Sequence, residues 1–566
     1  MDWMSEAAVE AAIHLEGRLR PGFGPKSWAE FSSRLSEHGE PIFRLLHRLY
    51  GWRYDFAWLY EQFIDLGAEG FRQRPRFLRA IDRRSTTPPS WLADPASLMA
   101  MADLDRYAGT VKGLRDRFDH LATLGVTHLH LISPDPAPGA ADPGSPAGSP
   151  HPWRSHRLGT TKQLRKIAAE LREIDVTLVL DMRVGPTTVA YQDPELLKAV
   201  AGEMVYLANL GAGVIRVDGA GWLWKEGEPG SANPEAHLLF EVLAALTSMA
   251  APSTILLSGA MVPSETAAEF VRPDEFRLAY NSSLMSSVWE ALATSDTRLL
   301  SVALGDRFRP PAGCTWITYL RSNDDLGWWF ADPDAVARGI DPDAHRRYLS
   351  TFYTGQWAGS SARGQVARTL PDGIATVSGT AASLAGLESA VEALDAQASD
   401  IAVRRVLAAW AVIIGAGGVP MVFLGDEIAQ LSAHAYTADP TLDPDPRWSQ
   451  RPFFEPARFQ SAADGQGPEG AVLAGFRRLL EIRRAINGFG PEVRPTPVDL
   501  GDPSLIAFQR GPVLVVVNMT DHPLILTRTG LPDGELHDLV AGEPWAGHLL
   551  GPYEYRYVER RPPHAA

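Results

Sequence analysis

Cysteine is almost missing from this chain of 566 residues, because Cys314 is the only one. A single cysteine excludes an intrachain disulfide and any metal site built from several cysteines. The chain also lacks a block of lysine and arginine, and its formal net charge is −15. A nucleic-acid backbone is therefore not an expected partner.

One uncharged run, at 406–425, has the length of a membrane span. Gly417, Gly418 and Pro420 interrupt it, so we interpret it as a buried helix followed by a strand and expect no membrane span. The first residues, MDWMSEAAVE, have neither the cationic nor the apolar part of a secretory signal. We expect a cytoplasmic protein.

The composition is that of a globular protein, with 45% hydrophobic and 21% charged residues, which excludes wholesale disorder. Residues 1–95 are predicted to form an N-terminal helical domain. Apolar side chains recur there at helical spacing, for example at positions 42, 45, 46 and 49. Pro88 and Pro89 end this part.

Short apolar segments alternate with helical patterns over 96–485. The predicted strands are 126–132, 176–180, 214–217, 254–257, 315–319 and 419–424. Such alternation predicts an α/β fold, a (β/α)₈ TIM barrel, and Asp193 followed by Pro194 predicts the start of one of its helices. Residues 486–566 are predicted to form a C-terminal antiparallel β-sandwich domain, with strands at 505–508, 513–518 and 524–526.

Arg216 and Asp218 end one predicted barrel strand. Residues two apart on a strand point to the same side, and barrels of this class place active sites at the carboxyl ends of their strands. An arginine beside an aspartate keeps the carboxylate ionised, as a nucleophile requires. The alternative is an ion pair that only closes the end of the barrel.

A second polar group follows the strand at 315–319 and contains Asn323, Asp324 and Asp325. These side chains suit sugar hydroxyls or a cation, and the alternative is a loop cap. Trp328 offers either a face for a sugar ring or a core side chain. A third acidic pair, at positions 426 and 427, is interpreted as a structural turn.

The chain resembles the amylosucrase branch of the α-amylase superfamily, glycoside hydrolase family 13, over nearly its whole length. The resemblance rests on several stretches together: DRYAG at 105–109, THLHL at 127–131, IRVD at 215–218, LRSNDDLGW at 320–328, VSGTAA at 377–382, FLGDE at 423–427 and RWSQRP at 447–452.

This resemblance implies retaining α-glucosyl transfer through two carboxyl groups. Asp218 takes the place of the nucleophile and Arg216 that of the arginine that orients it. Asp324 takes the place of a third carboxylate that holds sugar hydroxyls. Arg451 falls near the glucose pocket, where Asn323, Asp325 and Trp328 are expected to contact substrate. No metal and no cofactor are implied, and the implied partner is an α-glucoside.

The departures from the family pattern concern the chemistry itself. Gly259 stands where the family has its acid/base glutamate, and Asn323 stands where a histidine is expected. The family's Asn-His pair after the third strand is replaced within 181–186, and its D-G-G-Y-like stretch after the first strand is replaced by the segment 134–158, which is rich in proline, glycine and alanine. The 34 residues between Asp181 and Arg216 are too few for the family's excursion domain, so we expect an open, shallow site there. A long insertion at 330–395 is kept.

Three functions remain open. The favoured one is a non-catalytic or repurposed barrel that binds a carbohydrate or a protein partner. The second is a transglucosylase that keeps Asp218 as nucleophile and uses an activated donor such as a glycosyl phosphate. The third is ordinary sucrose or α-glucan turnover with a substitute acid, for which Glu265, Glu226 and Glu228 are candidates. Restoring a glutamate by Gly259→Glu is expected to raise sucrose activity. The sequence indicates no oligomeric state.

Overall fold

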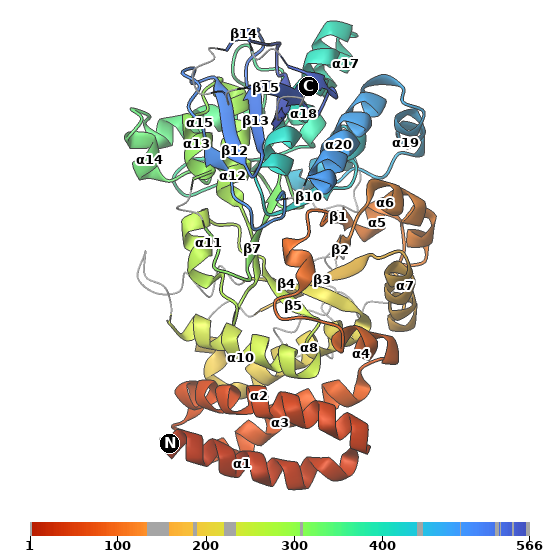
Figure 1. Cartoon of the computed structure of the whole chain (residues 1–566), viewed down its shortest axis with the longest axis vertical. Coiled ribbons are helices and arrows are strands. Elements are labelled where there is room, and N and C mark those ends of the chain that lie inside the picture. Colours follow the sequence, from red (N-terminus) through yellow and green to blue (C-terminus); the bar gives the residue numbers. More distant parts are fainter. Residues whose placement is uncertain are drawn as a thin grey trace.

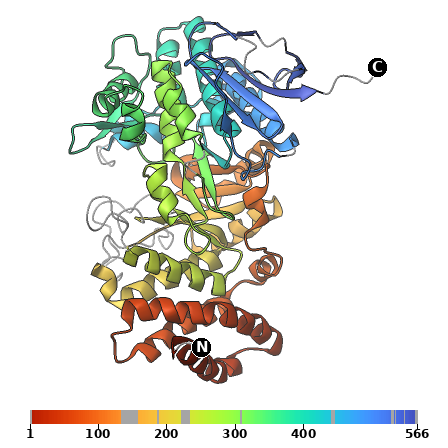
Figure 2. The same cartoon turned by 60° about the vertical axis from the view of Figure 1, so that its left-hand side comes forward.

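The computed structural model describes residues 3–132, 158–184, 189–219, 234–305, 309–438, 445–486, 488–526, 531, 534–545 and 548–561. Three parts follow one another along the long axis of the molecule, as Figure 1 and Figure 2 show. Helices occupy the amino-terminal end, a barrel lies in the middle, and antiparallel sheets lie at the other end. The limits of the three predicted domains remain a prediction.

Eight parallel strands close into a barrel, in the order β1-β10-β7-β6-β5-β4-β3-β2. The predicted (β/α)₈ fold is confirmed. The strands are β1 (Met99–Asp103), β2 (His128–Ile132), β3 (Thr177–Arg183), β4 (Ala212–Asp218), β5 (Ile255–Ser258), β6 (Leu278–Tyr280), β7 (Thr315–Tyr319) and β10 (Val419–Phe423). The helices associated with them include α6 (Phe118–Leu124), α7 (Thr161–Glu173), α8 (Pro194–Leu210), α10 (Pro234–Ala250), α11 (Ser264–Phe270), α12 (Ser282–Thr294), α13 (Arg298–Ala303), α18 (Ala396–Gly415) and α20 (Gly467–Ala485).

The sequence pattern did not predict two of the barrel strands, β1 and β6. Strand β1 reads MAMAD and has no β-branched residue, whereas β6 has only three residues. Both are fully buried and pair on both sides, β1 with β10 and β2, and β6 with β5 and β7. The neighbouring strands therefore impose the extended conformation that local propensity does not indicate.

The sequence correctly predicted a helix start where a capping residue and a first-turn proline mark it. Asp193 caps α8 by accepting a hydrogen bond from the Glu195 amide, with Pro194 in the first turn. The run at 406–425 is the end of α18 followed by β10, as interpreted from its glycines and proline. Among the described residues, no helix is both long enough and apolar enough to cross a membrane.

Two amino-terminal helices, α2 (Pro25–Tyr50) and α3 (Phe56–Gln73), pack on α10 of the barrel, and α3 also packs on α8. Helix α1 (Trp3–Leu19) packs on α2 and α3. The packing is close because α3 presents glycines to its partners. A Cβ atom at Gly67 would lie 2.2 Å from the Met249 Cε atom, and one at Gly70 would lie 2.2 Å from the Val205 Cγ1 atom. These helices thus support the barrel from the side of α8 and α10.

Between β7 and α18 the chain forms a separate group of elements. It contains α14 (Asp332–Val336), α15 (Pro342–Tyr353), the hairpin of β8 (Gln365–Thr369) and β9 (Ala375–Ser378), α16 (Ala381–Leu384) and α17 (Leu387–Glu392). An isolated bridge between Leu326 and Val377 joins the hairpin to the segment that follows β7. The insertion therefore lies against the segment that carries Asp324.

The carboxyl-terminal part is antiparallel, as predicted. A six-stranded sheet has the order β11-β12-β13-β18-β15-β16, and β14 (Leu524–Ile525) pairs with β17 (Leu549–Leu550). The six strands are β11 (Thr496–Pro497), β12 (Leu505–Arg510), β13 (Val513–Asn518), β15 (Glu535–Asp538), β16 (Glu543–Pro544) and β18 (Tyr555–Arg561). One face of β13 joins the core of the barrel through Val513, Val515 and Val517, and the other face joins a second small core with Leu550.

A buried arginine connects this sheet to the barrel. Arg510 on β12 donates hydrogen bonds to five carbonyl oxygens, those of Ile414, Gly415, Phe489, Gly490 and Val493, at 2.7–3.4 Å. Two of these carbonyls belong to the last turn of α18, which has no helical partner for them. The guanidinium therefore caps a barrel helix from within the sheet.

Replacing Arg510 by leucine should lower the free energy of unfolding by at least about 3 kcal/mol, because several buried carbonyl oxygens lose the hydrogen-bond donor that the guanidinium provides. Urea unfolding followed by circular dichroism measures this change. Arg478→Leu is the matched control, since Arg478 is exposed and donates to the carbonyls of Leu539 and Val540. Equal losses in the two variants would contradict the role assigned to burial.

The buried His128 on β2 makes stability depend on pH. Burial lowers the pKa of its imidazole from 6.5 to about 3. The stability it contributes is therefore complete above pH 6.5 and is lost as the pH falls toward 3. Between pH 7 and pH 5 this group should cost about 2 kcal/mol, so His128→Phe should flatten the pH dependence of urea unfolding relative to the parent. The exposed His548→Phe serves as control, and an unchanged slope in the His128 variant would contradict this assignment.

Candidate active site

Two ion pairs lie side by side across β3 and β4, at the carboxyl end of the barrel. In the parallel register Asp181 is the partner of Arg216, and Arg183 is the partner of Asp218. Residues two apart on a strand point to the same side. The four side chains therefore form two layers in which the order of the charges is reversed.

The inner layer is buried and centres on Arg216, whose side chain is 4% exposed. Its guanidinium donates to Asp181 Oδ1 at 3.4 Å and to Asp324 Oδ2 at 3.2 Å, and it lies over the Tyr280 ring. His130 Nε2 lies 2.8 Å from the same Asp181 oxygen. Burial alone would raise the pKa of Asp181, but His130 and Arg216 outweigh it and lower that pKa. This layer is a permanent ion pair.

The outer layer is half-exposed. Arg183 Nε donates to Asp218 Oδ2 at 3.1 Å, with 53% of the Arg183 side chain and 36% of the Asp218 side chain exposed. Among the hydrogen bonds of the described residues, Asp218 is thus held by Arg183, whereas Arg216 turns to the other two aspartates. The resemblance implies that Arg216 orients Asp218, but the hydrogen bonds of its guanidinium to carboxylates go to Asp181 and Asp324.

Asp324 is brought next to these layers by the segment after β7. Its side chain is 32% exposed and lines a hollow with Tyr319, Arg321 and Met261. Burial raises the pKa of Asp324; Arg216 opposes this rise, and the negative charge of Asp218 adds to it. The charge of Asp218 therefore acts on Asp324, and the assignment of both carboxylates to one catalytic site stays a prediction.

Arg451 and Asn323 are also adjacent. An Arg451 Nη2 hydrogen donates to the backbone oxygen of Asn323 at 2.7 Å, and Arg451 Nε lies 4.0 Å from Asp103 Oδ2 at the end of β1. The Asn323 side-chain oxygen is buried and has no hydrogen-bond partner among the described residues. Asp325 lies 3.6 Å from Arg368 of the hairpin.

Trp328 does not belong to this group. It is 5% exposed, stacks on Tyr353 and donates its indole hydrogen to Ser350. Its faces are therefore not available to a sugar ring, because the insertion after β7 packs against them. The turn at 426–427 is structural, as interpreted: Asp426 pairs with Arg321 at 2.8 Å, and Glu427 lies 2.9 Å from His120.

No side chain fits at position 259. A Cβ atom there would lie 2.7 Å from the Val217 carbonyl oxygen and 3.0 Å from the Asp218 Cα atom. Both are backbone atoms of β4, and the Gly259 amide donates to that same Val217 oxygen at 2.9 Å. The position that the resemblance assigns to the family's acid is thus closed by the approach of two strands, so Gly259→Glu is not expected to raise sucrose activity, contrary to the expectation from the sequence.

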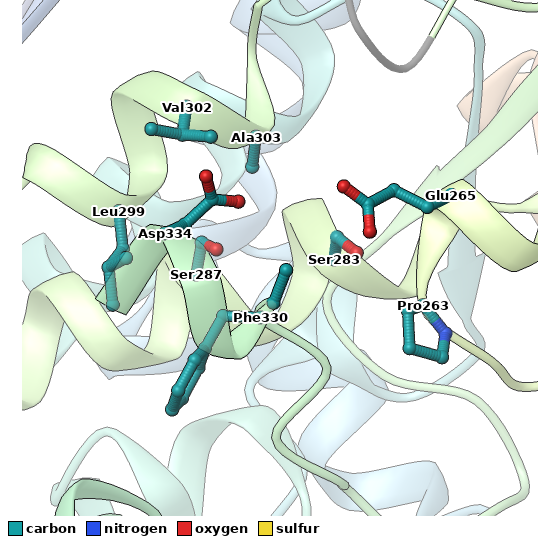
Figure 3. A pocket seen from close by; sticks show the side chains of 10 residues that line it. Pro263, Glu265, Ser283, Ser287, Leu299, Val302, Ala303, Phe330 and Asp334 are labelled. Atoms are coloured by element: carbon teal, nitrogen blue, oxygen red, sulfur yellow. The ribbon is translucent and has the colours of Figure 1, made fainter. Parts of the chain in front are cut away.

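Of the substitute acids, Glu265 faces a different pocket. That pocket lies between α11, α12, α13 and α14. Figure 3 shows Glu265 on one side of it, with Ser283 between it and Asp334 on the other side. Asp218, Arg216 and Asp324 are not among its lining residues. Glu226 and Glu228 lie outside the described residues, as do 134–157 and 185–188, so the predicted openness of the site is untested.

Sequence reasoning missed Arg183, His130 and Tyr280 as members of the site. Arg183 could have been predicted from the sequence, because it follows Asp181 at the same two-residue spacing that pointed to Arg216 and Asp218. Among the described residues, no group of three histidine, cysteine or acidic side chains is placed to hold a metal ion.

Because the backbone of β4 closes the space at position 259, any side chain placed there should lower the stability of the protein. Gly259→Ala should lower the free energy of unfolding by about 1–3 kcal/mol, because β4 and β5 must move apart. Gly17→Ala is the matched control, since nothing lies within 4 Å of the added carbon in α1. Denaturant unfolding measures both, and a Gly259→Ala variant as stable as the parent would contradict the closure.

Comparisons with known proteins give distant relatives. No protein-family model matches the chain. A glucosylglycerate phosphorylase from Allomeiothermus silvanus is 24% identical over 388 residues, which are 66% of this chain and 64% of that protein. A glucosylglycerate phosphorylase from Escherichia coli is 24% identical over 307 residues, or 53% and 52% of the two chains. The matched part is thus less than two thirds of the length of either relative.

Solved structures share the fold. An α-amylase from Geobacillus thermoleovorans, complexed with acarbose, has a TM-score of 0.54 at 12% identity and covers 83% of this chain and 99% of its own. A cyclic α-maltosyl-(1→6)-maltose hydrolase from Arthrobacter globiformis has a TM-score of 0.52 at 16% identity, covering 84% and 100%. The relatives and the shared barrel together support the α-amylase superfamily for this chain, without distinguishing a branch within it.

Proposed function

We propose that this protein binds α-glucosyl groups at the carboxyl end of its barrel. It transfers them only from donors whose leaving group departs without being protonated. The observation that carries the proposal is the contrast between Asp218, which is half-exposed, and position 259, which two strands close. The amylosucrase branch remains our proposal for its place in the superfamily, on the motifs quoted above.

Asp218 supplies the nucleophile in this proposal. A retaining transfer needs one carboxylate to attack the anomeric carbon and to hold the sugar as an ester. Asp218 is partly exposed and lies beside two cations, Arg183 and Arg216. Asp324 stands near enough to interact with it electrostatically, and its partly exposed carboxylate suits sugar hydroxyls.

The missing acid then selects the donor. A sugar alkoxide leaves poorly unless an acid protonates it, and such help is worth about 10²- to 10⁴-fold in rate. Phosphate and fluoride leave as stable anions and need no such help. The phosphorylases among the relatives support a glucosyl phosphate as the natural donor class.

A second candidate function is binding of an α-glucoside without turnover. It is favoured by the ion pair of Arg183 with Asp218, which occupies the nucleophile's oxygen in the free protein. The structural neighbours described as complexes with acarbose or maltose support carbohydrate as the ligand class. A protein partner remains the further alternative in this case.

Turnover of α-glucosyl fluoride separates these functions. The parent protein should release fluoride, and Asp218→Asn should abolish the release, since no other nucleophile is proposed. Sucrose should be cleaved at least about 10²-fold more slowly than by an enzyme with the acid in place. A fluoride electrode and glucose detection measure both rates.

Asp400→Asn is the matched control, because Asp400 is an exposed aspartate that pairs with Arg404 on α18. It should keep the parent rate. If the parent protein releases no fluoride from α-glucosyl fluoride, the transfer proposal is wrong. Calorimetric binding of maltose that is lost in Asp324→Asn would then support the binding function. Rapid sucrose cleavage would instead require an acid that neither function includes.

A further inference from the structure

We propose that the amino-terminal helices carry a second binding site, an aromatic platform of Trp3, Trp52, Tyr54 and Trp58, which binds a chain of α-linked glucose units beside the barrel. The α-glucosyl class of the ligand rests on the proposed function. The site itself rests on the exposure, the fixed positions and the location of these side chains.

The platform holds most of the exposed aromatic side chains of the described residues. Trp52 is 73% exposed, Tyr54 is fully exposed, and Trp3 and Trp58 are more than half exposed. Elsewhere in the described parts of the chain, only Trp357 and Phe453 are exposed to this degree among the phenylalanines, tyrosines and tryptophans. Single exposed apolar side chains are ordinary, but a group of them marks a binding surface.

Three helix ends bring the platform together. Its residues come from the start of α1, from the loop that joins α2 to α3, and from the first turn of α3. The Trp3 ring lies edge-on against His47 in the last turn of α2, with the ring centroids 5.1 Å apart. His47 also meets Phe56, the first residue of α3, at 5.2 Å. These helices lie side by side at the amino-terminal end of the molecule (Figure 1).

The Trp52 ring is fixed in place by its neighbours. Its indole nitrogen donates a hydrogen bond to the Leu49 carbonyl oxygen at 3.3 Å. The Arg53 guanidinium lies over the ring, 5.9 Å from its centroid, and is itself held by two hydrogen bonds of 2.8 Å to Asp55. A ring that is already ordered loses little conformational entropy when a ligand stacks on it.

The charges of the loop favour a neutral, hydroxyl-rich ligand. Residues 51–55 contain one cation and one anion, Arg53 and Asp55, which pair with each other. Nucleic acid and anionic membrane surfaces require unpaired cations. The core of a protein–protein interface is depleted of charge, whereas here an ion pair stands between Trp52 and Tyr54. A sugar chain suits this arrangement, because its apolar ring faces stack on aromatic rings and its hydroxyls bond to charged groups.

The platform lies on the side of the barrel where the candidate active site lies. At the end of α2, the Tyr50 hydroxyl donates a hydrogen bond to the Tyr191 carbonyl oxygen at 2.7 Å. Tyr191 belongs to the connection between β3 and α8. In a (β/α)₈ barrel such connections follow the carboxyl ends of the strands, as Asp218 does. A glucan bound to the platform therefore lies on the side where the barrel opens.

Electrophoresis through gels that contain soluble amylose tests the platform without turnover. Amylose should retard the parent, and Trp52→Ala and Tyr54→Ala should each weaken amylose binding at least about threefold, and about tenfold or more together. Trp52→Phe should retain part of the binding. Trp357→Ala is the matched control, because Trp357 is an exposed tryptophan outside the platform, and it should behave as the parent. Equal retardation of the parent and the double variant, or equal retardation by barley β-glucan, would overturn the inference.

Hydroxyl-radical footprinting provides a second test that needs no variant. Maltoheptaose should lower the oxidation of Trp52, Tyr54 and Trp58 and leave that of Trp357 unchanged. Unchanged oxidation of the platform would overturn the inference. Protection that rises with protein concentration and does not depend on maltoheptaose would identify a second copy of the chain as the occupant, and would overturn it as well.

The platform and the proposed function fail separately. Asp324→Asn should leave retardation by amylose unchanged, and a complete loss of retardation in this variant would assign the binding to the barrel and overturn the platform. If the parent releases no fluoride from α-glucosyl fluoride but amylose binding depends on Trp52 and Tyr54, the transfer function fails and the platform stands. If fluoride is released but amylose binding does not depend on them, the platform fails and the transfer function stands.

Discussion

The site is organised around one buried guanidinium. Arg216 has almost no contact with solvent, so its charge must be met by the carboxylates of Asp181 and Asp324. Asp181 in turn holds His130 on the next strand. This chain of contacts fixes β2, β3, β4 and the segment after β7 relative to one another. It keeps Asp324 at the rim of the barrel whether or not a reaction takes place there.

A second constraint is the close approach of β4 and β5. The Gly259 amide bonds to the Val217 oxygen, and the space in which a side chain would start is taken by backbone. The absence of a side chain at position 259 is therefore built into the path of the main chain and is not a simple exchange of one side chain. In the proposed function, the chemistry of the site is limited by where protons can go, because Asp218 serves as nucleophile and Asp324 holds the sugar while no acid stands at position 259.

Much of the barrel was predictable from sequence, because its longer strands are apolar runs and helix starts such as Asp193-Pro194 carry their own chemistry. Strands β1 and β6 were not, because one lacks β-branched residues and the other is too short to show a pattern. Asp218 and Asp324 could be expected to interact, since both follow strand ends of one barrel. The burial of Trp328 could not be predicted, because it results from tertiary packing of the insertion after β7 against the indole ring. The closure at Gly259 depends on an interstrand distance that no local pattern contains.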